Sequence, residues 1–110
     1  MKYLMLVVAD PENDGSEAPP VTIEEWGAEV DRRAVWREGD RLVPPASAKT
    51  VRRRSGRVSV TDGPFAETHE WIAGFDVIEC DSLEDALEIA AQHPQATHGA
   101  IEVRPFWPLG

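Results

Sequence analysis

Residues 71–80, WIAGFDVIEC, constrain the fold of this 110-residue chain more than any other stretch. Successive side chains of a strand point to opposite faces, and here both faces are largely apolar: Trp71, Ala73, Phe75 and Val77 on one, Ile72, Ile78 and Cys80 on the other. A strand of this kind must be covered on both sides. In so small a chain helices can cover one face, and we expect a second subunit to cover the other. The pattern therefore predicts a homodimer.

Two further strands are indicated near the ends of the chain. Residues 3–9 form a continuous apolar run that stops at Asp10-Pro11, which is typical of a central strand, and residues 10–21 have the composition of a solvated loop. Residues 100–104 alternate, with apolar side chains facing inward and Glu102 and Arg104 facing outward. We expect this pair to line a cleft or to bond to each other.

Two helices are predicted from capping signals and apolar periodicity. Thr22 has Glu25 three residues later, the spacing of a capping box, and a helix over residues 22–38 would then be closed by Gly39. Ser82 and Asp85 repeat the spacing ahead of a second amphipathic helix that runs to about residue 93 and is stopped by a proline.

A β-hairpin is predicted for residues 49–61, where two strands flank Ser55-Gly56. This turn places Val51 opposite Val60, and Arg54 opposite Arg57. The arginine pair carries like charges, so the tip is either solvated or in contact with an anion.

The element order is strand, helix, hairpin, strand, helix, strand, in a single domain over residues 1–110. Two right-handed crossovers on a mainly antiparallel sheet give an α+β, ferredoxin-like sandwich with the helices on one face.

Charge and cysteine content exclude several classes of protein. A formal net charge of −9 repels polyanions, which argues against nucleic-acid binding. Cys80 is the only cysteine, so no intramolecular disulfide can form, and a reducing cytoplasm fits best. No apolar run approaches the roughly 18 residues that span a bilayer, so we expect no membrane association.

Residues 61–71, TDGPFAETHEW, concentrate the ionisable side chains that could do chemistry. Asp62 precedes a Gly-Pro turn, so it either bonds the backbone of that turn or takes part in a site. A neutral His69 next to Glu67 and Glu70 could serve as a general base, or form a solvated ion pair. His98, ahead of the last strand, is a further candidate. The three histidines have none of the usual metal-ligand spacings, so no metal or cofactor is expected.

The motif DGPF at residues 62–65, followed by Glu67, Glu70 and the later segments SLEDALEIA and GAIEVRP, resembles the DGPF subgroup of the YCII-related proteins. The resemblance extends over nearly the whole chain. It implies a ferredoxin-like fold whose sheets pair in a dimeric α/β barrel, with a cleft between sheet and helices. Some related proteins carry a His–Asp dyad, and some DGPF members are associated with sigma factors. Here residues 22–38 contain no histidine, and His93 stands where those relatives tend to carry Asp.

Three functional hypotheses follow. The first is a cytoplasmic homodimer that binds a small molecule in a cleft near the DGPF loop, with Phe65, Glu67, Glu70, Glu102 and Arg104 as ligand-binding candidates. The second is an acid–base enzyme that uses Asp62 with His69 or His98. The third is a regulatory module that meets a protein partner such as a sigma factor.

Overall fold

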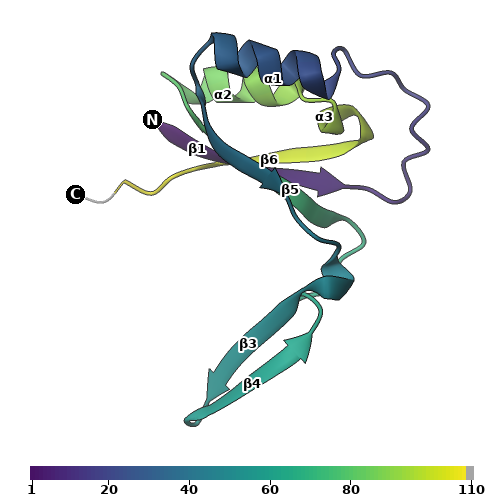
Figure 1. Cartoon of the computed structure of the whole chain (residues 1–110), viewed down its shortest axis with the longest axis vertical. Coiled ribbons are helices and arrows are strands. Elements are labelled where there is room, and N and C mark those ends of the chain that lie inside the picture. The colour runs from purple at the N-terminus through teal and green to yellow at the C-terminus, as the bar shows by residue number, and fades with distance from the viewer. Residues whose placement is uncertain (109–110) are drawn as a thin grey trace.

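The computed structural model describes residues 1–108 and contains a four-stranded antiparallel sheet, three α-helices and a separate two-stranded hairpin (Figure 1). The elements, in chain order, are β1 (Lys2–Ala9), α1 (Ile23–Arg32), β2 (Trp36–Arg41), the 3₁₀ turn η1 (Pro45–Ser47), β3 (Lys49–Arg54), β4 (Arg57–Asp62), β5 (Trp71–Glu79), α2 (Leu83–Gln92), α3 (Gln95–His98) and β6 (Gly99–Pro105).

The main sheet has the strand order β2-β5-β1-β6, and every neighbouring pair is antiparallel. With α1 and α2 as the crossovers, this is the ferredoxin-like arrangement, so the α+β class and the fold predicted from the sequence are confirmed. The helices all lie on one face of the sheet (Figure 1).

The core lies between that face and the helices. Tyr3, Met5 and Ile78 on the two central strands are fully buried, and they belong to one apolar cluster with Trp26 and Val30 of α1. The N-termini of both long helices are capped as expected. Thr22 and Glu25 form a complete capping box, and the Ser82 side chain accepts a hydrogen bond from the backbone N–H of Asp85.

The first helix is shorter than predicted, and a strand was missed. Helix α1 ends at Arg32, and the chain turns through Ala34 in the left-handed region (φ 56°). Residues 36–38, predicted as the end of the helix, instead begin β2. Gly39 is therefore a strand residue and not a helix stop. The cause is tertiary structure: β2 forms the edge of the sheet by pairing with β5, and this pairing outweighs the helical pattern of residues 33–38.

The short helix α3 was also not predicted. Within residues 1–108 no helix has the length and apolar content needed to cross a membrane.

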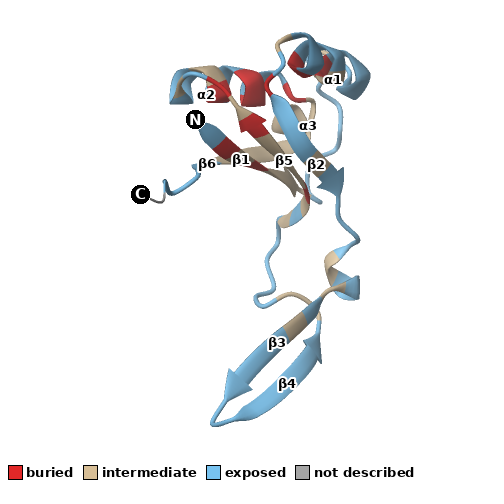
Figure 2. Ribbon diagram, turned by 60° about the vertical axis from the view of Figure 1, so that its left-hand side comes forward, coloured by how far each residue is buried: buried red, intermediate tan, exposed pale blue. Residues whose placement is uncertain are grey.

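The hairpin has the predicted turn and register but not the predicted place in the fold. Val51 pairs with Val60 and Arg54 with Arg57. However, β3 and β4 pair only with each other and project from the body as an arm (Figures 1 and 2). The radius of gyration is 16.2 Å, whereas a compact domain of this size has about 13 Å. The hairpin is thus an insertion between the second and third strands of the ferredoxin-like sheet.

On the face of the sheet opposite the helices, the two central strands β1 and β5 present apolar side chains that no element within residues 1–108 covers. Directly opposed residues of antiparallel strands share a face, so Leu4 lies beside Val77 and Leu6 beside Phe75 on this open face. These side chains are half-buried, in contrast to the fully buried residues on the helix side (Figure 2).

Candidate functional site

A cleft opens between the helix-covered face of the sheet and the first helix, and its floor is built from two glycines and an aspartate. Gly39 of β2 lies opposite Asp76 of β5, and Gly74 lies two residues before Asp76 on the same strand face. A Cβ on Gly39 would fall 2.3 Å from Oδ1 of Asp76, and one on Gly74 would fall 2.8 Å from the Asp40 carbonyl oxygen. The missing side chains therefore leave room for the carboxylate and for the cleft above it.

The walls of the cleft are mostly apolar. Ile23 and Trp26 of α1 form one side, and the segment from His93 to Gln95, which joins α2 to α3, forms another. Val7 and Ala9 of β1 contribute further apolar surface. The cleft is open to solvent and has a volume of about 500 Å³, within the range of small-molecule sites.

His93 is the one buried polar residue of the described chain, at 6% exposure. Its Nδ1 accepts a hydrogen bond from the backbone N–H of Gln95 at 3.0 Å, which places the ring proton on Nε2. The ring packs edge-on against Trp26, with centroids 4.7 Å apart. Burial lowers the pKa of His93, so the imidazole is neutral at physiological pH. Among residues 1–108 nothing hydrogen-bonds Nε2, so this N–H donor remains for a ligand.

Asp76 is partly buried in the floor of the same cleft. Its Oδ1 accepts a hydrogen bond from the Trp36 indole N–H at 2.8 Å. Burial raises the pKa of Asp76, and the bond from Trp36 offsets part of that effect. One cleft thus holds a neutral histidine and a carboxyl group that resists ionisation, and perturbed groups of this kind are frequent at functional sites.

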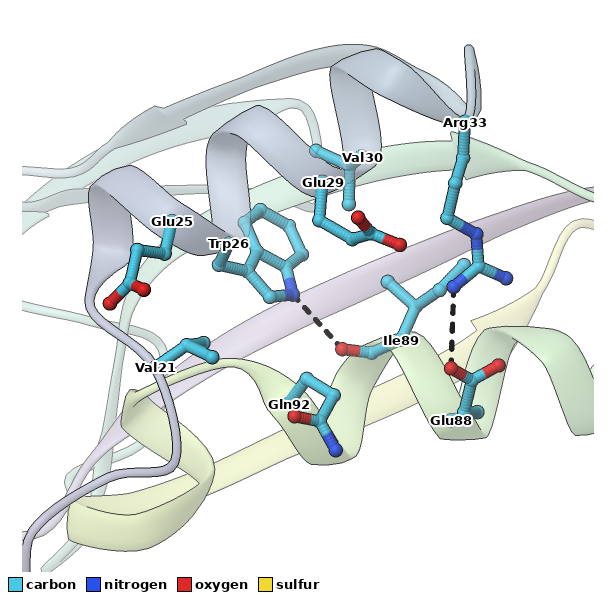
Figure 3. Close-up of a pocket in the computed structure, with 9 residues that line it drawn as sticks. All are labelled: Val21, Glu25, Trp26, Glu29, Val30, Arg33, Glu88, Ile89 and Gln92. Carbon is cyan, nitrogen blue, oxygen red and sulfur yellow. Dashed lines mark hydrogen bonds and ion pairs between the residues drawn. The ribbon is translucent and has the colours of Figure 1, made fainter.

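A second hollow, of about 400 Å³, lies between α1 and α2 (Figure 3). Most of its polar groups are already engaged: the Trp26 indole donates to the Ile89 carbonyl at 3.0 Å, and Arg33 pairs with Glu88 at 3.3 Å. Glu25 serves the capping box. This groove is accounted for by helix packing, so the cleft above Asp76 is the better candidate.

The three residues named as catalytic candidates have separate partners. Asp62, at the end of β4, pairs with Lys49 across the hairpin. Nε2 of His69 lies 3.4 Å from Glu12 of the first loop, and His98 Nε2 lies 2.8 Å from the Glu17 carbonyl oxygen. No hydrogen bond or ion pair joins Asp62 to either histidine within residues 1–108.

The ligand-binding candidates lie on two other surfaces. Glu102 and Arg104 project from the open face of the sheet, where they bond to each other at 2.5 Å. Phe65, Glu67 and Glu70 are exposed in the loop between β4 and β5. Their role in ligand binding stays a prediction.

Sequence reasoning did not single out Asp76. The available signal was an acid in the middle of a strand that is otherwise apolar on both faces, where a carboxylate needs a special environment. Gly39 and Trp36, which supply that environment, lie in the strand that was mistaken for helix, so the grouping was not visible.

Comparison with known proteins identifies the family of the chain. The model of the YCII-related domain matches residues 1–109, and the chain belongs to this family. An uncharacterised protein of Rhizobium meliloti (strain 1021) is 48% identical over 68 residues, which is 60% of this chain and 55% of that protein. The match thus spans about half the length of the relative.

Substitution Asp76→Asn is expected to stabilise the protein at neutral pH, by a few degrees in Tm. The pKa of the carboxyl is higher in the folded than in the unfolded state, so ionisation above the ordinary value of 3.8 favours unfolding. Asparagine cannot ionise and still accepts the Trp36 N–H. The gain should shrink as pH falls toward that ordinary value, where wild-type Asp76 is itself protonated. Thermal unfolding from acidic to neutral pH measures this; a gain independent of pH would contradict the proposed burial of the carboxyl.

Proposed function

We propose that this YCII-related protein is a cytoplasmic homodimer that binds a small molecule in the cleft between Asp76 and His93. The observation that carries the proposal is that two titratable groups, each shifted toward its neutral form by burial, line one largely apolar cleft.

The lining suggests the chemistry of the ligand. Trp26 and Ile23 offer apolar contact area, which suits a hydrocarbon ring. The Nε2–H of His93 is a donor for a hydroxyl or carbonyl oxygen, and Asp76 accepts from a hydroxyl or amine. Because burial disfavours charge at both groups, we infer an uncharged ring compound that carries at least one oxygen.

The dimer is supported by the open face of the sheet. Leu6 and Phe75 lie side by side there with no covering element from the described chain. A second copy packed on this face would give the two-sided burial that residues 71–80 demand. We also propose that the protein is a member of the DGPF subgroup and that its dimer is an α/β barrel.

The loop that carries the DGPF motif has a positional link to the cleft. It leads directly into β5, and Ala73 and Gly74 near the start of that strand line the cleft. A ligand bound in the cleft would therefore change the environment of the strand into which the loop leads. A sigma-factor partner rests on the family resemblance, and the exposed Phe65 of this loop is where such a partner would make contact.

Acid–base catalysis in the same cleft is the second candidate function. The altered pKa values of Asp76 and His93 favour it, whereas Asp62, His69 and His98 are held by separate partners. A compound bound by the wild type would be followed by NMR for turnover. Turnover lost in Asp76→Asn with binding retained would establish catalysis, and an unchanged compound would leave binding as the function.

Binding can be tested by thermal shift with phenol, cyclohexanol and benzene at millimolar concentration. A ligand that binds only the folded state raises Tm, and we expect the two hydroxylated rings to do so more than benzene. His93→Phe should remove the difference between phenol and benzene, whereas the exposed control Glu84→Gln should keep it. If none of the three rings raises Tm, the inferred ligand class is wrong.

A further inference from the structure

The β3–β4 arm has an apolar face without a core of its own. Val51, Val58 and Val60 share one face of the ribbon with Arg53, and the three valines are 64%, 53% and 62% exposed. An isolated two-stranded hairpin is at best marginally stable in water and needs packing against another layer. Figure 2 shows nearly all of the arm exposed and the arm remote from the buried core. The valine face therefore lacks a partner within the described chain.

The arm and the body also carry opposite charge. Residues 49–62 contain five basic residues and one acid, Asp62, a net charge of +4. The rest of the chain has six basic residues and nineteen acids, a net charge of −13. Two copies of the chain are thus complementary, arm to body, and the complementarity disfavours arm-to-arm contact.

The body offers an acidic margin beside an apolar surface. On the edge strand β2, Glu38 is paired with Val77 and Asp40 with Phe75, so both acids border the open face of the sheet. Both are exposed, and among residues 1–108 no basic side chain is paired with them. This margin combines what the valine face of the arm requires: apolar side chains for the valines and carboxylates for Arg53.

We propose that the arm of one subunit packs with its valine face on the β2 side of the open face of the second subunit. Arg53 then meets Glu38 and Asp40 of the other copy, and the valines cover Val77 and Phe75. The second copy is the occupant because its charge complements the arm and because the same chain supplies both uncovered apolar surfaces. The inference rests on the proposed homodimer and adds to it an arm exchanged between subunits.

Sedimentation velocity over a concentration series tests the arm. The triple variant Val51→Thr, Val58→Thr, Val60→Thr keeps β-branched side chains but removes apolar area, and it should raise the dimer Kd about tenfold or more. The matched control Ser59→Thr, Thr61→Ser alters the other face of the same strand and should leave Kd unchanged. Because the arm lies outside the core, the variants should keep the wild-type circular dichroism.

Charge reversal identifies the docking site. Glu38→Lys with Asp40→Lys should weaken the dimer, and adding Arg53→Glu should restore part of the affinity. The control Asp81→Lys with Glu84→Lys makes the same change of charge beside and on α2, in the helix layer, and should have the smaller effect. The wild-type dimer should weaken as NaCl rises from about 50 to about 500 mM.

The possible results distinguish failure of the dimer from failure of the arm contact alone. A wild-type protein that is monomeric at micromolar concentration overturns the dimer and the arm together, while leaving ligand binding in the cleft open to its own test. A dimer whose Kd is the same in the valine triple variant and its control overturns the arm alone. A photocrosslinker at Val58 that captures a peptide of β2 or β5 from the second subunit supports it; capture within the same subunit contradicts it.

Discussion

Replacement of Trp26 by alanine is expected to destabilise the protein by about 3–5 kcal/mol, which is the range for truncating a buried tryptophan. Trp26 is 4% exposed, packs edge-on against His93, and donates its indole proton to the Ile89 carbonyl. Its loss opens a cavity between α1 and α2 and leaves that carbonyl without its side-chain donor. A domain of this size has a total stability of about 5–15 kcal/mol, so a large part would be lost. Urea unfolding measures the change.

Trp26→Phe is the control that separates packing from the hydrogen bond. Phenylalanine keeps an aromatic ring next to His93 but has no N–H, so we expect a smaller loss than for alanine. The ring substitution should also preserve ligand binding better than alanine does, because Trp26 forms a wall of the cleft. An alanine variant as stable as the wild type would show that Trp26 does not join the helices to the core.

Gly39→Ala is expected to cost about 1–3 kcal/mol and to abolish ligand binding. The new Cβ would lie 2.3 Å from Oδ1 of Asp76 and 2.6 Å from the Phe75 carbonyl oxygen, so the strand or the carboxylate must move. Movement of Asp76 would break its bond to Trp36 and change the floor of the cleft. Urea unfolding and the thermal-shift assay with phenol measure the two effects.

Gly27→Ala is a matched glycine control for which we expect the opposite change in stability. Gly27 lies inside α1, and a Cβ there meets no atom within 4 Å. Alanine in a helix interior is favoured over glycine by about 0.5–1 kcal/mol, so this variant should be more stable than the wild type. Equal effects of the two substitutions would mean that Gly39 has no special role at the cleft.

Much of the fold could be predicted because the local signals were strong. The capping box at Thr22 and the N-cap at Ser82 located both long helices, and the Ser55-Gly56 turn fixed the register of the hairpin. The failure at residues 33–38 has a physical reason: their apolar spacing fits a helix, but pairing with β5 completes the sheet. Pairing between strands that are distant in the sequence cannot be recognised from the local sequence pattern.

The candidate site was harder to predict for the same reason. The ionisable side chains that cluster in the sequence at residues 61–71 lie apart from one another in the fold. Asp62 pairs with Lys49 across the hairpin, and His69 pairs with Glu12 of the first loop. The cleft instead brings His93, at the end of the predicted second helix, together with Asp76 and Gly39 from the two strands at the sheet edge. Proximity in sequence was a poor guide to proximity in space.

The indole N–H signals of the tryptophans offer the most direct measurement of whether this cleft binds a ligand. In a ¹H–¹⁵N spectrum titrated with phenol, we predict that the Trp36 signal moves, because its proton is donated to Asp76, and that the Trp26 signal moves with it. Trp107 is 88% exposed and does not line the cleft, so its signal should stay in place. Saturable shifts of Trp26 and Trp36 that are lost in Gly39→Ala would support the site. Saturable phenol binding that moves neither signal would contradict it.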